Sequence, residues 1–117
     1  MSMESVPNKL IVLWVTQDKQ AAMNMAFMYA RNSKVRGWWD QVELVIWGPS
    51  ATLVLEDGDI QQELKLLQSV GVTVKACKAC TNRYGITEEL MAFGIEVVSM
   101  GLPLTEDLKN GVRVLTV

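Results

Sequence analysis

The fold follows from one stretch near the start of the chain, Lys9-Leu-Ile-Val-Leu-Trp-Val-Thr16. This stretch is rich in β-branched and aromatic residues and shows no polar alternation, which is typical of a strand buried on both faces. Four later segments are strand candidates of the same kind: residues 41–47, 72–76, 95–99 and 112–117. The pattern therefore predicts a five-stranded sheet that other elements cover on both sides.

Helical segments are predicted between these strands, over residues 20–34, 50–55, 59–70, 87–93 and 105–110. Thr87 is expected to cap one of these helices and Gly94 to end it, while Asp57 precedes another as a turn and cap. Strands that alternate with helices need crossover connections, which favour parallel pairing. The sequence thus predicts an α/β fold, a three-layer α/β/α sandwich with a mostly parallel five-stranded sheet.

The composition fits one domain. The chain has 117 residues, of which 50% are hydrophobic, and its formal charge is -2. We expect a single domain over residues 9–117, preceded by a disordered or extended N-terminus over residues 1–8.

The sequence also bears on partners and location. No run of basic residues is long enough to bind along a phosphate backbone, so no direct nucleic-acid partner is expected. The longest wholly apolar run is far below the roughly 20 residues that span a bilayer, and no export signal is visible, so we expect no membrane partner and a cytoplasmic location.

The chain contains no histidine and only two cysteines. Without histidine, a Ser-His-Asp or Cys-His catalytic set cannot form within one chain. Two cysteines alone cannot complete a tetrahedral zinc site. We therefore expect no metal and no cofactor, and thiolate chemistry is the one reactive option that the composition leaves.

The two cysteines follow the third predicted strand, in the connection Cys77-Lys-Ala-Cys80. Ligands of open parallel sheets bind beyond the carboxyl ends of the strands, where this connection lies. Nearby cations favour the thiolate, and the candidates for this electrostatic support are Lys75, Lys78 and Arg83. A nucleophilic or sulfur-carrying thiol, a thioredoxin-like dithiol, and a pair of small buried apolar side chains all remain open at this point.

A second connection at the same edge, Gly48-Pro49-Ser50, has two interpretations. Its backbone amides and the Ser50 hydroxyl could bind an anion at a helix start. A turn followed by an N-cap is the more common role of such a segment.

One predicted helix is apolar nearly all round, in the stretch Ala21-Ala-Met-Asn-Met-Ala-Phe-Met-Tyr-Ala30. A surface helix normally shows a single apolar stripe, so the outer side of this helix is either buried in a small core or covered by another subunit. Methionine suits irregular packing at interfaces, and the chain also carries four tryptophans. These features favour a homo-oligomer.

The stretch Gly71-Val-Thr-Val-Lys-Ala-Cys77, followed by Cys80, Arg83, Gly85 and Ile86, resembles the signature of the DsrE/DsrF-like family of small, TusD-related sulfur-relay proteins. The resemblance implies a parallel five-stranded sheet, assembly as trimers or hexamers, and sulfur donor and acceptor proteins as partners. It also implies that the cysteine after the third strand accepts sulfur as a persulfide, and this position maps onto Cys77. Cys80 matches a second cysteine found in many members, and it could release the stored sulfur by forming a disulfide.

Three functions are therefore carried forward from the sequence. The first is a sulfurtransferase-like carrier with Cys77 as acceptor, and the second is a dithiol redox protein or sensor. The third is a non-catalytic oligomeric binding protein whose cysteines are only packed. Whether the chain is an enzyme depends on which of the three holds.

Overall fold

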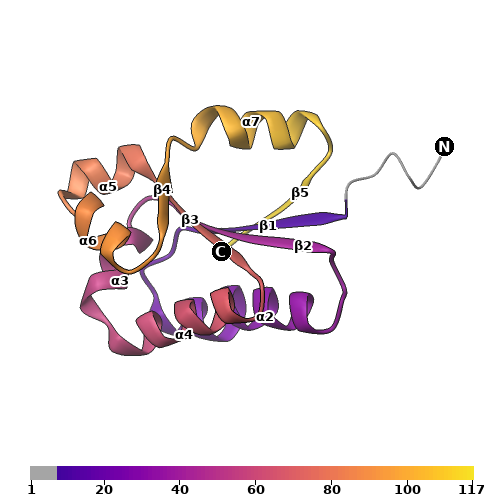
Figure 1. The fold of residues 1–117 in the computed structure, drawn as a ribbon, viewed down its shortest axis with the longest axis horizontal. Coiled ribbons are helices and arrows are strands. Elements are labelled where there is room, and N and C mark those ends of the chain that lie inside the picture. The colour runs from indigo at the N-terminus through magenta and orange to yellow at the C-terminus, as the bar shows by residue number, and fades with distance from the viewer. Residues whose placement is uncertain (1–7) are drawn as a thin grey trace.

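The structure, a computed structural model, describes residues 8–117 and alternates strands with helices (Figure 1). In chain order the elements are β1 (Lys9–Trp14), α1 (Lys19–Ala21), the π-helical η2 (Ala22–Phe27), α2 (Met28–Val35), β2 (Gln41–Ile46), α3 (Ser50–Glu56), α4 (Gly58–Ser69), β3 (Thr73–Cys77), α5 (Lys78–Tyr84), α6 (Thr87–Ala92), β4 (Glu96–Val98), α7 (Gly101–Lys109) and β5 (Arg113–Thr116). The prediction for residues 1–8 falls, apart from Asn8, outside the described residues.

The five strands form one sheet in the order β4-β3-β2-β1-β5. Every neighbouring pair is parallel, so the predicted parallel sheet is confirmed. Helix α7 lies over one face, whereas α2 and α4 lie against the other (Figure 1). Helices α5 and α6 lie beyond the carboxyl end of β3, where they contact each other, β4 and α3. The predicted α/β architecture with helices on both faces is therefore correct.

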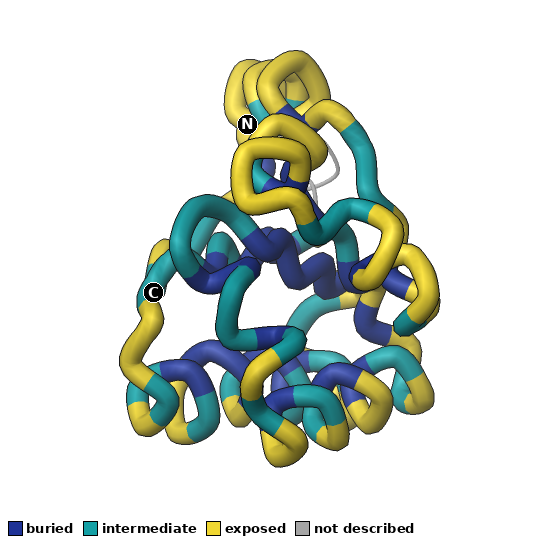
Figure 2. The backbone as a smooth tube through the Cα atoms, turned by 90° about the vertical axis from the view of Figure 1, so that its left-hand side faces the viewer, coloured by how far each residue is buried: buried dark blue, intermediate teal, exposed yellow. Residues whose placement is uncertain are grey.

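The hydrophobic core lies on both sides of the sheet, and Figure 2 shows the buried residues concentrated in the strands between the helical layers. On the α2 and α4 side, Trp14 and Phe27 are fully buried, and their rings meet edge to face with centroids 4.8 Å apart. On the α7 side, a smaller cluster comprises Ile11, Val45, Cys77, Met100 and Val112. Alternate residues of each strand supply the two clusters, which explains the absence of polar alternation.

Two predicted elements differ from the structure. Helix α7 begins at Gly101, four residues before the predicted start, because Pro103 lies in the first helical turn, where its missing N–H costs no hydrogen bond. Helix α5 was not predicted, since its sequence Lys-Ala-Cys-Thr-Asn-Arg-Tyr has no apolar stripe of helical spacing. Only Thr81 of α5 is fully buried, so this helix stands at the end of the sheet rather than on its face.

Thr87 is not the N-cap that the sequence suggested. Ile86 occupies the capping position, and it makes no side-chain cap bond. The hydroxyl of Thr87 instead lies 2.8 Å from the Thr81 hydroxyl and donates to Oδ1 of Asn82 over 2.5 Å. This hydroxyl therefore ties α6 to α5 instead of satisfying amides of its own helix.

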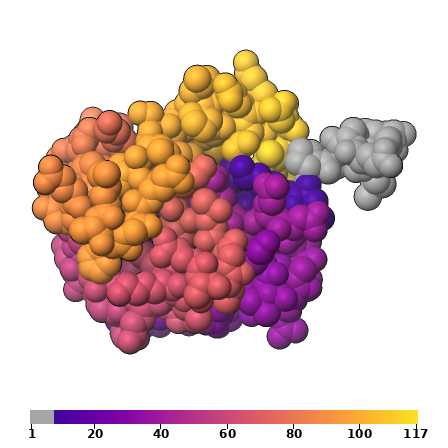
Figure 3. Space-filling model, viewed as in Figure 1, coloured from indigo at the N-terminus to yellow at the C-terminus, as the bar shows by residue number. Residues whose placement is uncertain are grey.

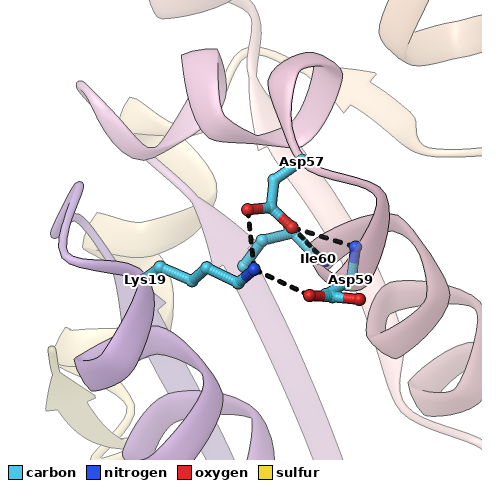
Figure 4. A network of polar contacts seen from close by, with 4 residues as sticks. All are labelled: Lys19, Asp57, Asp59 and Ile60. Carbon is cyan, nitrogen blue, oxygen red and sulfur yellow. Dashed lines mark hydrogen bonds and ion pairs between the residues drawn. The ribbon is translucent and has the colours of Figure 1, made fainter.

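Asp57 does cap α4, as predicted. One carboxylate oxygen accepts hydrogen bonds from the backbone amides of Asp59 and Ile60, over 2.9 and 3.1 Å (Figure 4). Lys19 lies 3.0 Å from the Asp57 carboxylate and 2.7 Å from that of Asp59. The Lys19 ammonium lowers the pKa of Asp57 below its ordinary value. This network joins the start of the α1–α2 helical stretch to the start of α4.

Candidate functional site

The two cysteines lie where β3 passes directly into α5. Cys77 is the last residue of β3 and occupies the capping position of α5, with extended backbone angles. Cys80 lies within the first turn of the helix. The cysteine connection is therefore a strand-to-helix junction rather than a loop, and the helical turn holds both side chains at the carboxyl edge of the sheet. Figure 3 shows that α5 and α6 form the left-hand part of the molecular surface in the view of Figure 1.

Cys77 faces inward. Its exposed fraction is 4%, and it belongs to the cluster beneath α7, with Val45 and Met100 among its members. Strand alternation places Cys77 on the same face of β3 as Lys75, and this is the face of the sheet that α7 covers. A reagent in solution meets little of this thiol in the folded chain.

Cys80 is only partly buried, and its sulfur accepts a hydrogen bond from the backbone N–H of Gly48 over 3.2 Å. Gly48 has a φ of +71°, a left-handed conformation that glycine adopts at low cost. Burial raises the pKa of the Cys80 thiol above its ordinary value of 9.0, and the Cys77 thiol raises this pKa further. The Gly48 amide and the charge of Arg83 oppose the rise in pKa.

A cavity of about 200 Å³ opens at Cys80, and its lining residues are Gly48, Ala79, Cys80, Arg83 and Tyr84. The cavity therefore combines a thiol, a backbone amide aimed at its sulfur, and one guanidinium. Lys78 is exposed on the same helix but does not line this cavity. Of the three cations named from the sequence, Arg83 is the one that the structure brings to a sulfur.

Lys75 has a different partner. Its ammonium lies 2.9 Å from Oε1 of Glu43, whose side chain is almost fully buried on the neighbouring strand β2. This bond raises the pKa of Lys75. Lys9 approaches the other oxygen of the same carboxylate at 3.9 Å. The Lys75 ammonium thus compensates the charge of a buried carboxylate. This ion pair lies toward the amino ends of the strands, away from the thiols.

Ser50 is not the N-cap of its helix, because its hydroxyl is directed to backbone carbonyl oxygens. Its buried hydroxyl lies 2.6 Å from the carbonyl oxygen of Trp14 and 3.1 Å from that of Trp47, to which it donates. Pro49 takes the capping position of α3 without a side-chain hydrogen bond. Ser50 therefore fastens the ends of β1 and β2 together, and Gly48 is the residue of this connection that contacts a cysteine. The sequence named the backbone amides of this connection as candidate donors, and the Gly48 amide is the one that donates to a sulfur.

A family model described as DsrE/DsrF-like matches residues 9–117, which includes every element of the sheet. The chain belongs to the DsrE/DsrF-like family. This match confirms the resemblance seen in the stretch from Gly71 to Ile86, and it covers every strand and helix of the described fold. A comparison with functionally curated proteins found no match.

Solved structures share this fold. The chain is similar to a conserved protein of unknown function, BT1422 from Bacteroides thetaiotaomicron, with 42% identity and a TM-score of 0.90 over 94% of this chain and 95% of that one. It is also similar in fold to the ychN protein from E. coli (24% identity, TM-score 0.76, 96% and 100% covered). MTH1491 from Methanobacterium thermoautotrophicum, of unknown function, has 17% identity and a TM-score of 0.73 over 93% and 99% of the two chains.

Two further features of residues 8–117 bear on the kind of site. No described helix is both long and apolar enough to cross a membrane. Within the same residues, no group of three or more His, Cys, Asp or Glu side chains is arranged to hold a metal ion. The described chemistry at this edge of the DsrE/DsrF-like fold is that of two thiols, one amide and one guanidinium.

Proposed function

We propose that this DsrE/DsrF-like protein is a cytoplasmic sulfur carrier that holds sulfur as a persulfide on Cys80. The observation that supports the proposal is the position of the Cys80 sulfur, which borders an open cavity and accepts a hydrogen bond from Gly48. A carrier thiol must meet its donor and its acceptor in turn, so it needs access from solvent. Cys80 has this access, and Cys77 is 4% exposed. We therefore assign the acceptor role to Cys80 instead of Cys77.

Loading is a nucleophilic substitution at sulfur. The Cys80 thiolate attacks the outer sulfur of a donor persulfide, a new S–S bond forms, and the donor's own S–S bond breaks. The electron pair of the broken bond stays on the donor, which leaves as a thiolate. Nothing is oxidised or reduced overall, so the step needs no cofactor. The N–H of Gly48 stabilises the negative charge on the Cys80 sulfur before the attack.

Unloading can follow two routes. An acceptor thiolate can attack the outer sulfur and carry it away, which restores the Cys80 thiol. Alternatively, the Cys77 thiolate attacks the inner sulfur of the persulfide, which forms a Cys77–Cys80 disulfide and releases the outer sulfur as sulfide. The second route reduces the stored sulfur by two electrons and oxidises the two cysteines by the same number.

A dithiol redox function is the second candidate, because the two cysteines lie within one turn of each other and the Cys77 thiol affects the pKa of Cys80. This function needs a disulfide that forms and opens reversibly, whereas sulfur carrying needs only one accessible thiol. A Cys77→Ser variant separates the two functions. It abolishes dithiol cycling, but it still accepts sulfur if Cys80 is the carrier.

Sulfur donor and acceptor proteins are proposed as partners, and copies of the chain are proposed to associate. The outer side of η2 and α2 leaves Met25 and Met28 50% and 43% exposed, and Trp38 is 53% exposed beside them. These side chains line an apolar cavity of about 680 Å³, and none of its lining residues within 8–117 is charged. Exposed apolar side chains gathered around one cavity favour an interface, and a second copy, which presents the same apolar side chains, is its proposed occupant.

The experiment that tests the proposed function is incubation with a persulfide donor, followed by intact-mass measurement. The account predicts an added mass of about 32 Da, the mass of one sulfur atom, on the wild-type protein and on Cys77→Ser. Cys80→Ser is expected to gain no such mass.

A further inference from the structure

The cavity at Cys80 carries the positive charge of Arg83, and none of the described residues that line it is acidic. Arg83 and Cys80 are three positions apart on α5, a spacing that places both side chains on one side of a helix. The α5 sequence Lys-Ala-Cys-Thr-Asn-Arg-Tyr also contains no acidic residue. The charge at the cavity therefore comes from the same helix that holds the thiol.

Arg83 has no ion-pair partner among residues 8–117, since every ion pair within 4.0 Å in that part of the chain involves other cations. A guanidinium offers five N–H donors in a planar fork, which matches the oxygens of a carboxylate or a sulfonate. An unpaired guanidinium beside a half-buried thiol can thus bind the anionic end of a molecule whose other end reaches the sulfur.

The size of the cavity limits that molecule. At about 200 Å³, it is smaller than the roughly 300–1,000 Å³ typical of sites for drug-sized ligands. A compact molecule, with its anionic group a few bonds from the reacting sulfur, fits such a space. Tyr84 adds an exposed aromatic ring to the lining.

We propose that the Cys80 cavity selects small sulfane-sulfur donors that carry an anionic group, and that Arg83 binds this group. The inference rests on the proposed sulfur-carrier function and adds the substrate class. Two classes of compound combine a sulfane sulfur with an anionic group. They are alkyl persulfides that carry a carboxylate, and sulfur compounds that carry a sulfonate-like group.

The transfer step balances for both sources. The Cys80 thiolate attacks the terminal sulfur, and the bond between that sulfur and the rest of the donor breaks. The electron pair leaves on a carboxylate-bearing thiolate in the first case and on sulfite in the second, where thiosulfate is the donor. Cys80 becomes a persulfide each time. Arg83 is a binding residue in this step, because it holds the anionic end while charge develops on the leaving group.

The test compares rates of sulfur loading for matched donors. The probes are 3-mercaptopropionate persulfide, the persulfide of the corresponding neutral amide, and thiosulfate, each followed by the 32 Da mass increase. For the wild-type protein we expect the carboxylate donor to load about tenfold faster than the amide donor, the size typical of one charge-assisted hydrogen-bond pair. Thiosulfate shows whether the sulfonate source is used as well.

The matched variants are Arg83→Gln and Lys109→Gln, which remove one positive charge each. Lys109 is exposed at the end of α7 and does not line the cavity. Arg83→Gln is expected to reduce the carboxylate preference to about twofold or less, while Lys109→Gln keeps it near tenfold. Within each variant, the ratio of the two loading rates does not depend on the pKa of Cys80, because the same thiol attacks both donors.

Equal wild-type rates for the carboxylate and amide donors would overturn the inference, as would a preference that survives in Arg83→Gln. Loading by a protein persulfide alone, with no loading by any small donor, would also overturn it while leaving the sulfur-carrier function intact. If no donor of any kind loads Cys80, the proposed function itself fails.

Discussion

The backbone N–H of Gly48 donates a hydrogen bond to the sulfur of Cys80 over 3.2 Å. This contact joins the end of β2 to the first turn of α5, two segments 32 residues apart in the sequence. The half-buried Cys80 thiol thus has a backbone hydrogen-bond donor, and this contact distinguishes Cys80 from the inward-facing Cys77.

Substituting Gly48 tests the importance of this donor. A β-carbon at Gly48 would lie 3.6 Å from Val15, an ordinary contact, so the cost of Gly48→Ala comes from the φ of +71°. We expect the free energy of unfolding to fall by about 1 kcal/mol, as is typical for a side chain placed in the left-handed region. The pKa of Cys80 should rise further, because the strained loop no longer aims its amide at the sulfur. Alkylation rate against pH measures this pKa.

Gly101→Ala is the matched control for this substitution. Gly101 begins α7, and its added β-carbon would have nothing within 4 Å. This variant is expected to keep the pH profile of Cys80 unchanged. An unchanged profile in Gly48→Ala as well would contradict the assigned role of the amide.

The two thiols should differ in reactivity. In the folded state, Cys80 of the Cys77→Ser variant is expected to react with iodoacetamide at least about tenfold faster than Cys77 of Cys80→Ser, because Cys77 is sealed in the core. The Cys80 rate should keep rising with pH beyond 9.0, since its folded pKa lies above that value. Mass spectrometry over time gives both rates. Equal rates for the two thiols would remove the basis for choosing Cys80 as the carrier.

Lys75 is expected to stabilise the fold without affecting the thiols. Lys75→Met leaves the buried Glu43 carboxylate with Lys9 alone, at 3.9 Å, and should lower the free energy of unfolding by about 2 kcal/mol, as when a mostly buried pair is broken. Urea titration measures this loss. The alkylation rate of Cys80 should stay within about twofold of wild type, because the Lys75 ammonium contacts Glu43 rather than a sulfur.

A double variant provides the control for the ion pair. Glu43→Leu with Lys75→Met removes both charges and is expected to recover part of the lost stability, since an apolar pair avoids the unpaired buried carboxylate. A Lys75→Met protein with full stability but slow alkylation of Cys80 would instead support the electrostatic role that the sequence suggested.

The exposed methionines of η2 and α2 should control assembly. We expect wild-type protein to sediment with a mass above the 13.0 kDa of one chain, and Met28→Glu to sediment as a monomer because it places a charge in the apolar patch. Met91→Glu is the matched control, since Met91 is 56% exposed on α6, away from this patch. A strictly monomeric wild type at micromolar concentration would disprove the association.

Much of the fold could be predicted because buried strands leave a strong local pattern. The five apolar segments and their alternation with helices predicted the parallel sheet, and Asp57 predicted the start of α4. Helix α5 could not be predicted in this way, since it stands at the end of the sheet and needs no apolar stripe. The α7 start was misplaced because glycine and proline suggest a loop unless their position in the first turn is known.

The site was predicted less completely, because the sequence identifies the types of residue but not the directions in which their side chains point. The sequence named Cys77, Cys80, Lys75, Lys78 and Arg83, but their spacing did not show which sulfur faces a cavity. Strand alternation placed Lys75 on the face of Cys77, yet its long side chain extends to Glu43. The role of Gly48 depends on a contact 32 residues away, which no local pattern reveals.

Intact-mass measurement after exposure to a persulfide donor tests the central claim most directly. The account predicts that the wild-type protein and Cys77→Ser each gain about 32 Da, that reductant removes this mass, and that Cys80→Ser gains nothing. A 32 Da gain on Cys80→Ser that is lost in Cys77→Ser, or no gain on the wild-type protein, would contradict the assignment of Cys80 as the sulfur carrier.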